Sequence, residues 1–303
     1  MSDNPAQCGG FGARLVAKVG ERGPLCAGID PHPEMLRHWG LSDDATGLES
    51  FALGAVQALA SEVAVIKPQS AFFERHGARG IAVLERALAA TKDAGALVLL
   101  DVKRADIGST MAGYAEAYLS DGAPLAADAI TVSPYLGVGA LDPAFELAAT
   151  TGRGVFVLAL TSNPEGADVQ GAFTATGSPV AQHVVDHVAS RNGVYRASGR
   201  GCCGRTPGHI GVVVGATATA RSLRLEALGG PVLVPGIGAQ GATLANLGRW
   251  FGTVRHLVPT TSRNLLRHGP EPAALRRAVR RAADEAADLL CNASWQDDGS
   301  TPR

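Results

Sequence analysis

Three charged residues at one point of the sequence could carry out acid–base chemistry. Residues 97–107 read LVLLDVKRADI, an apolar run that ends in the spacing Asp-x-Lys-x-x-Asp at Asp101, Lys103 and Asp106. Because side chains alternate along a strand, we expect Asp101 and Lys103 on the same side of it. A lysine beside carboxylates keeps its proton and leaves the carboxylates ionised. An ion-pair cluster at the protein surface would explain the same residues, so the surrounding chain is needed to separate the two interpretations.

Strand-like segments of the same kind recur along the chain. Eight short apolar segments are each followed by a helix or a helix-like segment. They cover residues 25–30, 63–67, 96–103, 129–133, 154–160, 211–215, 231–235 and 254–258. Nearly uniform apolar strands are typical of parallel strands that are covered on both faces. Eight such units in about 250 residues predict an α/β protein with a single (β/α)8 TIM barrel.

The barrel predicts one catalytic domain over residues 1–303, with a core at about residues 25–290 and flexible ends. The main alternative is a doubly wound open sheet, which binds dinucleotides through a Gly-x-Gly-x-x-Gly turn after its first strand. Here Asp30-Pro31 follows the first strand instead. We also find no linker that would divide the chain into two domains.

Composition narrows the class of protein further. The 303 residues are 46% hydrophobic and carry a formal net charge of −1, which gives no support for a nucleic-acid or membrane-surface partner. We find no apolar run of membrane-spanning length and no signal peptide at the start. The five cysteines are few, odd in number and irregularly spaced, which is typical of a reducing compartment. We therefore predict a cytoplasmic protein.

Polar or special residues stand at the end of nearly every predicted strand. They are Asp30, Lys67, Asp101 with Lys103, Ser133, Ser162, Thr217, Gln240 and Arg263. In a barrel the carboxyl ends of the strands meet on one face, and TIM-barrel enzymes keep their active sites there. Core packing alone does not require polar residues at these ends, so their recurrence predicts an active site.

The last two strand ends have the character of a phosphate site. Residues 236–241 read GIGAQG before a predicted helix, and Arg263 follows the eighth strand. Loops after strands seven and eight of barrels commonly hold a phosphate, which arginine and a helix N-terminus both favour. We therefore expect a phosphate ester as substrate. No metal site is expected. His183 and His187 are four residues apart, but the acidic residue between them, Asp186, stands at the wrong position for His-Glu-x-x-His, and Cys202-Cys203 has no partner pair.

Several motifs in this order resemble one enzyme family, orotidine 5'-monophosphate decarboxylase, which makes UMP in pyrimidine synthesis. The resemblance covers about residues 25–290. It rests on Asp30, Lys67, the string Asp101-x-Lys103-x-x-Asp106-Ile107-x-x-Thr110, residues 161–164 (TSNP), residues 235–241 (PGIGAQG) and Ser262-Arg263. Residues 133–137 (SPYLG) and 214–217 (VGAT) resemble the longer bacterial branch of the family.

The resemblance implies a cofactor-independent decarboxylase that works as a homodimer with active sites at the interface. Lys103 would donate a proton to the C6 carbanion, in a charged tetrad that Lys67 and Asp101 of one subunit form with Asp106 of the other. The residues that would reach across the interface are Asp106, Ile107 and Thr110.

The resemblance also implies a set of substrate contacts for orotidine 5'-monophosphate. Asp30 and Lys67 would bind the ribose hydroxyls, assisted by Thr110. Ser162 would hydrogen-bond the edge of the pyrimidine. The 5'-phosphate would be held by Gln240 and Arg263.

Two other functions stay open. The magnesium-dependent 3-keto-L-gulonate 6-phosphate decarboxylase and hexulose-phosphate synthase group shares Asp-x-Lys-x-x-Asp, although Ile107, Thr110 and the Ser162 motif favour the pyrimidine enzyme. A non-catalytic nucleotide-binding barrel would keep the same residues without turnover. Two segments have no assigned role, a predicted long loop at residues 165–178 and a Gly-, Arg- and Cys-rich segment at 197–209 that is expected to be an exposed insertion.

Overall fold

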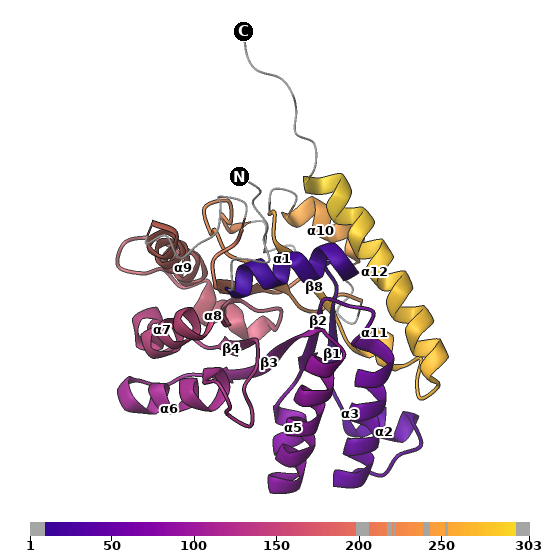
Figure 1. Ribbon diagram of the computed structural model, residues 1–303. Helices are drawn as coiled ribbons and strands as arrows, with labels where there is room; N and C mark the ends of the chain where they lie inside the picture. The colour runs from indigo at the N-terminus through magenta and orange to yellow at the C-terminus, as the bar shows by residue number, and fades with distance from the viewer. Residues whose placement is uncertain are drawn as a thin grey trace, which may run out of the picture.

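Eight parallel strands close into one barrel in the order in which they occur along the chain (Figure 1). The computed structural model describes residues 10–197, 206–216, 220, 222–238, 243–251 and 254–294. The strands are β1 (Cys26–Ile29), β2 (Val65–Pro68), β3 (Leu97–Arg104), β4 (Ala129–Val132), β5 (Gly154–Leu160), β6 (Ile210–Val214), β7 (Val232–Val234) and β8 (Leu257–Thr261). Pairing of Cys26 in β1 with Thr260 in β8 closes the ring. The predicted (β/α)8 fold is confirmed.

Helices surround the barrel and cover the outer faces of its strands (Figure 1). The longer ones are α3 (Ala45–Leu59), α5 (Gly77–Asp93), α6 (Gly108–Leu119), α7 (Asp142–Thr151), α9 (Val180–Ala197), α10 (Leu244–Phe251) and α12 (Pro272–Ser294), and a further long helix, α1 (Phe11–Arg22), lies at one end of the barrel. Shorter helices are α2 (Pro33–His38), α4 (Ala71–Glu74), α8 (Ala167–Gln170) and α11 (Arg263–Leu266), with 3-10 turns η2 (Val138–Leu141) and η3 (Pro164–Gly166). Asp44 begins α3 by accepting a hydrogen bond from Gly47 N at 2.8 Å, as an N-cap should.

The helix α1 fills the amino end of the barrel. Phe11 and Leu15 are each 2% exposed and belong to the cluster of apolar side chains inside the barrel. The Phe11 ring meets Phe156 edge-on at 5.9 Å between centroids, and a Cβ on Gly154 would lie 2.5 Å from that ring. The core therefore begins before residue 25, where we predicted its start. Residues 1–9 and 295–303, the predicted flexible ends, lie outside the described residues.

Three further predictions need correction. The last strand is β8 at Leu257–Thr261 instead of 254–258, because Pro259 pairs with Val234 and two buried threonines continue the strand. The predicted loop at 165–178 contains α8. Within the segment at 197–209, residues 207–209 are buried instead of exposed, because Pro207 packs against Gly12 of α1. Residues 198–205 lie outside the described part.

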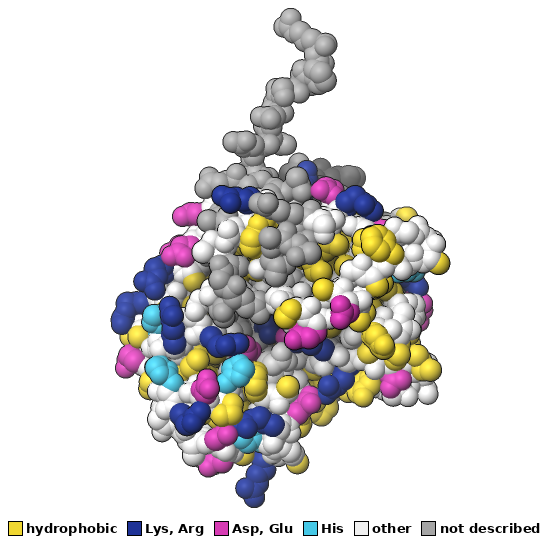
Figure 2. Space-filling model, turned by 180° about the vertical axis from the view of Figure 1, so that it is seen from behind, with side chains coloured by type: hydrophobic (Ala, Val, Ile, Leu, Met, Phe, Trp, Pro, Cys, Tyr) yellow, Lys and Arg dark blue, Asp and Glu magenta, His cyan; other side chains and the backbone are white. Residues whose placement is uncertain are grey.

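The described surface carries charges of both signs. On the face shown in Figure 2, Lys and Arg side chains are interspersed with Asp and Glu, and apolar side chains lie between them. Within the described part of the chain, no helix is long and apolar enough to cross a membrane.

Candidate active site

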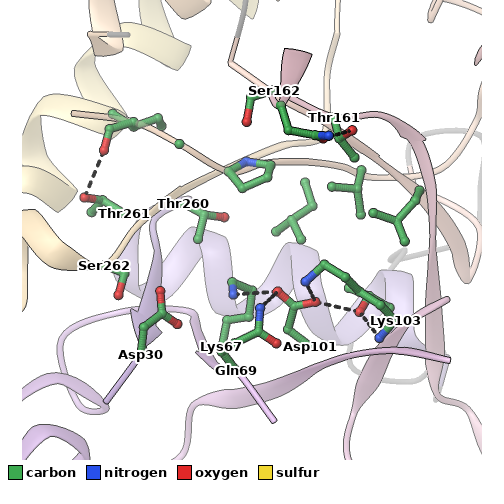
Figure 3. Close-up of a pocket in the computed structure, with 18 of the residues that line it drawn as sticks. Asp30, Lys67, Gln69, Asp101, Lys103, Thr161, Ser162, Thr260, Thr261 and Ser262 are labelled. Carbon is green, nitrogen blue, oxygen red and sulfur yellow. Dashed lines mark hydrogen bonds and ion pairs between the residues drawn. The ribbon is translucent and has the colours of Figure 1, made fainter. Parts of the chain in front are cut away.

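A cavity of about 310 Å³ opens at the carboxyl ends of the strands. Every strand or the loop that directly follows it contributes to its lining (Figure 3). The residues that bear on the chemistry are Asp30, Lys67, Gln69, Asp101, Lys103, Thr131, Thr161, Ser162, Asn163, Gly236, Thr260, Thr261, Ser262 and Arg263. The alternative of an ordinary surface ion-pair cluster at Asp101 does not fit, because Asp101 and Lys67 are only 7% and 5% exposed.

Asp101 is the centre of the charged wall of the cavity. Its Oδ2 accepts hydrogen bonds from Lys67 Nζ at 2.9 Å and from Gln69 Nε2 at 3.1 Å. Its Oδ1 accepts from Lys103 Nζ at 2.5 Å and from Thr131 Oγ1 at 2.7 Å. Figure 3 shows Lys67, Gln69 and Lys103 around this carboxylate. One buried anion therefore fixes two ammonium groups that come from neighbouring strands, β2 and β3.

The charges in this wall support each other's ionised forms. Burial alone would raise the pKa of Asp101, but the ammonium groups of Lys67 and Lys103 outweigh it and hold that pKa well below its usual range. Burial alone would lower the pKa of Lys67, but the carboxylates of Asp101 and Asp30 outweigh it and raise that pKa above its usual range. Both groups are therefore charged at neutral pH.

The backbone at Lys103 is in a conformation that residues other than glycine rarely adopt. Its φ is +46°, and the register between β3 and β4 shifts between Leu100 and Arg104. The Lys103 N–H donates to Thr131 Oγ1 at 3.0 Å, which holds the irregular end of the strand in place. Bulges of this kind re-aim side chains next to active sites. The Lys103 side chain stays 45% exposed while its ammonium group is tied to Asp101.

Two polar atoms on the β1 and β8 side of the cavity are buried without a hydrogen-bond partner among the described residues, Asp30 Oδ1 and Ser262 Oγ. Buried polar atoms in proteins are nearly always paired, so these two indicate groups that a ligand would satisfy. A Cβ on Gly28 would lie 2.7 Å from Ser262 Cβ, so only glycine lets β1 pass this close to the end of β8. Arg263 follows as the first residue of α11 and also lines the cavity.

The loop after β7 contains two glycines in backbone conformations that glycine favours. Gly236 has φ +99° and Gly238 has φ +82°. A Cβ on Gly238 would lie 1.5 Å from Asn264 Nδ2, so the loop passes close to α11. Gly236 and Ile237 line the cavity. Gln240, the other predicted phosphate ligand, lies outside the described residues.

The cavity brings together only some of the residues that the sequence singled out. Its lining includes Asp30, Lys67, Asp101, Lys103, Ser162 and Arg263. Its lining does not include Asp106, Ile107 or Thr110. The Asp106 carboxylate accepts a hydrogen bond from Ile107 N at 2.8 Å, and the Ile107 side chain is 61% exposed. Thr217, another predicted strand end, lies outside the described residues.

Gln69 and Thr131 are functional candidates that the sequence did not reveal. Gln69 lies two residues beyond Lys67 and so is a candidate for the same side of β2. Thr131 is the one hydroxyl in the apolar strand β4 (AITV). Both signals are weak in the sequence, because only the pairing of neighbouring strands brings these residues to Asp101. Among the described residues, no group of three or more His, Cys, Asp and Glu side chains is placed to hold a metal ion.

A closed (β/α)8 barrel whose strand ends all meet at one charged cavity has the architecture of a TIM-barrel enzyme. The sequence model described as "Orotidine 5'-phosphate decarboxylase / HUMPS family" matches residues 23–277. The chain belongs to this family.

Individual relatives distinguish between the groups that the family description names. The chain is 58% identical over 272 residues to a Salinispora tropica protein named orotidine 5'-phosphate decarboxylase, covering 89% of this chain and 95% of that one. A Streptomyces coelicolor protein of the same name is 54% identical, covering 91% and 96%. The solved structure of Leishmania donovani OMP decarboxylase is 28% identical with a TM-score of 0.71, covering 93% and 98%. These names favour the pyrimidine enzyme over the magnesium-dependent group.

Proposed function

We propose that this chain converts orotidine 5'-phosphate to UMP and CO₂ without a metal or an organic cofactor. The observation that carries the proposal is the Asp101 carboxylate shared by Lys67 and Lys103 in the cavity. The names of relatives at 58% and 54% identity support the same activity. We propose further that residues 1–303 act as one catalytic domain. A cytoplasmic location, supported by the few and irregularly spaced cysteines, is part of the proposal.

Lys103 is the proton donor in this mechanism. Loss of CO₂ from C6 of the orotate ring leaves an electron pair in the plane of the ring, where no simple π system can delocalise it. An ammonium group held next to C6 stabilises that negative charge and then delivers its proton to C6. The hydrogen bond between Lys103 Nζ and Asp101 fixes the ammonium group before the substrate reacts.

Remote binding energy must contribute as well. Two unit charges about 4 Å apart interact by only ~4 kcal/mol at an effective dielectric constant of 20. Very slow reactions need barrier reductions on the order of 20 kcal/mol. Contacts with the phosphate and ribose, far from the reacting carbon, can organise the closed site and so lower the barrier at C6.

The substrate contacts follow the distribution of polar groups around the cavity. Asp30 and Lys67 bind the ribose hydroxyls, and the buried, unpaired Asp30 Oδ1 supports this role. Ser162 meets the pyrimidine edge from the wall opposite Asp101 and the lysines (Figure 3). Arg263 grips the 5'-phosphate at the end of β8, together with Gln240.

The active form is a homodimer in which each subunit completes the other's site. Asp106, Ile107 and Thr110 lie outside the cavity of their own chain. Ile107 is 61% exposed, and Tyr135 and Leu136 on the neighbouring loop are 77% and 50% exposed. Large apolar side chains exposed near one another are typical of protein interfaces. In the dimer, Asp106 joins the partner's charged tetrad, Ile107 reaches the partner's site and Thr110 assists at its ribose.

A direct assay tests the activity. Purified protein is mixed with orotidine 5'-phosphate and EDTA, and the loss of substrate absorbance is followed. We expect turnover that EDTA does not change. A strict requirement for Mg²⁺ would instead favour the magnesium-dependent alternative, and tight UMP binding without turnover would favour the non-catalytic barrel.

A complementation assay tests the shared site. The variants Lys103→Ala and Asp106→Ala should each be inactive alone, because each lacks one member of every tetrad. A mixed dimer has one site with both residues intact, so random pairing in a 1:1 mixture should restore roughly a quarter of wild-type activity. A mixture that stays inactive while size-exclusion chromatography shows mixed dimers would contradict the arrangement.

A further inference from the structure

The chain segment that carries Ser162 separates two cavities. Residues 161–163 follow β5 and line the central cavity. The same three residues line a second cavity of about 340 Å³ on their other side. A wall with open space on both faces gains little dispersion energy from packing. Polar contacts must therefore hold this wall in place.

Gln170 supplies the contacts that hold the wall. Its Oε1 accepts a hydrogen bond from Thr161 N at 2.9 Å, and its Nε2 donates to Thr161 Oγ1 at 2.7 Å. One carboxamide thus binds both the backbone and the side chain of the residue directly before Ser162. The short helix α8 therefore presents this one side chain to the wall.

The neighbours of Ser162 are restrained on each side. Thr161 Oγ1 donates to Asn163 Oδ1 at 2.6 Å, so the residues before and after Ser162 are bound to each other. A Cβ on Gly215 would lie 2.9 Å from Ser162 N, so the end of β6 closes off movement in that direction. A Cβ on Gly166 would lie 2.9 Å from Thr161 Oγ1, so the absence of a side chain at Gly166 leaves space for the contact between Thr161 and Gln170. The position of Ser162 is thus set by the residues around it.

We infer that Gln170 is a positioning residue for base recognition: it fixes Thr161, and through it Ser162, so that the site selects ligands with a pyrimidine ring. Gln170 is not part of the lining of the central cavity, so it acts through the wall and not by touching the ligand. The inference rests on the proposed function, in which Ser162 meets the pyrimidine edge. It extends that function to a residue outside the cavity.

Isothermal titration of two ligands tests the inference. UMP carries the base, and ribose 5-phosphate carries the same sugar phosphate without it. In Gln170→Ala we expect UMP to bind about tenfold more weakly and ribose 5-phosphate to change by less than about twofold, because only the base contact depends on the wall. Gln170→Glu keeps the acceptor for Thr161 N and loses the donor, so its loss of UMP affinity should be smaller. Val169→Ala, on the exposed face of the same helix, is the matched control and should change neither affinity.

The variant Ser162→Ala separates this inference from the proposed function. If Gln170 acts through Ser162, then Ser162→Ala combined with Gln170→Ala should bind UMP no more weakly than Ser162→Ala alone. A selective loss of UMP affinity in Ser162→Ala would support the contact between Ser162 and the base. If Gln170→Ala then binds both ligands equally more weakly, or binds UMP with unchanged affinity, the inference about Gln170 is overturned. A Ser162→Ala variant that binds UMP as the wild type does would reject the base contact and the inference together.

Discussion

The two ends of the barrel share eight strands and differ in what fills them. At the carboxyl ends, each strand or its following loop contributes to a cavity of about 310 Å³ with a charged wall. At the amino ends, Phe11 and Leu15 of α1 close the interior by packing against residues such as Leu97. Closing an end with apolar side chains contributes stability, whereas a wall of buried charge does not favour folding in the same way. This barrel therefore separates the residues that stabilise the fold from those that act on a ligand.

Lys103→Ala gives the largest expected effect. It tests the carboxyl end of the barrel, which we call the open end because it holds the cavity. We expect kcat to fall by at least about ten-thousandfold, because the variant loses both the proton donor and the positive charge beside the carbanion. Stability should change little, since the Lys103 side chain is 45% exposed. Steady-state assays measure kcat, and thermal unfolding measures stability.

The matched control for this substitution lies at the amino end of the barrel, which we call the closed end because α1 fills it. Lys18→Ala removes a half-buried lysine of α1 whose partner is Glu21, and kcat should remain that of the wild type. Wild-type turnover in Lys103→Ala would refute the assigned chemistry. A large loss of turnover in Lys18→Ala would show that the two ends are not separate.

Phe11→Ala is the converse experiment at the closed end. The ring is 2% exposed and packs against Phe156, so its removal should lower the free energy of unfolding by about 3–5 kcal/mol. The folded variant should keep its kcat, because Phe11 lies at the other end of the strands from Lys103. Urea denaturation and assays at low temperature measure the two effects.

Phe173→Ala serves as the control, since that ring is 73% exposed on the loop after α8. Its stability should be close to that of the wild type. A Phe11→Ala variant that unfolds no more easily than Phe173→Ala would mean that α1 does not stabilise the barrel.

The open end is more predictable from the sequence than the closed end. Alternation along β3 and the rule for barrel strand ends are enough to place Asp101 and Lys103 in one site. The partners of Asp101 on other strands are harder to predict, because Gln69 and Thr131 meet it only through the pairing of β2, β3 and β4. The φ of +46° at Lys103 cannot be predicted from the residue type, because a positive φ is expected at glycine and not at lysine.

The packing of α1 at the closed end cannot be predicted from the sequence, for a physical reason. A short amphipathic helix shows that one face is covered but not what covers it, so the sequence does not assign α1 to the barrel interior. The predicted start of the core is therefore too late in the chain. The predicted limits of β8 are wrong because a proline usually ends a strand, whereas Pro259 pairs with Val234 and the strand continues beyond it.

His209→Gln has the smallest expected effect, a change in how the stability of the closed end depends on pH. His209 stands directly before β6, is 5% exposed, and its Nε2 lies 3.2 Å from Phe145 O. Burial lowers the pKa of His209 from 6.5 to about 4. The unfolded chain therefore takes up this proton first as the pH falls. The contribution of His209 to stability is complete above pH 6.5 and is lost between 6.5 and about 4, by at most roughly 3 kcal/mol.

In His209→Gln, this part of the pH dependence should vanish, because the amide does not titrate. Urea denaturation at pH 5 and 7.5 measures it as the difference in unfolding free energy between the two pH values, which should be smaller in the variant than in the wild type. His187→Gln, an exposed position on α9, should keep the wild-type difference. An unchanged difference in His209→Gln would mean that the buried imidazole does not couple folding to pH. A change in the pH profile of kcat would mean that the closed end reaches into the chemistry of the open one.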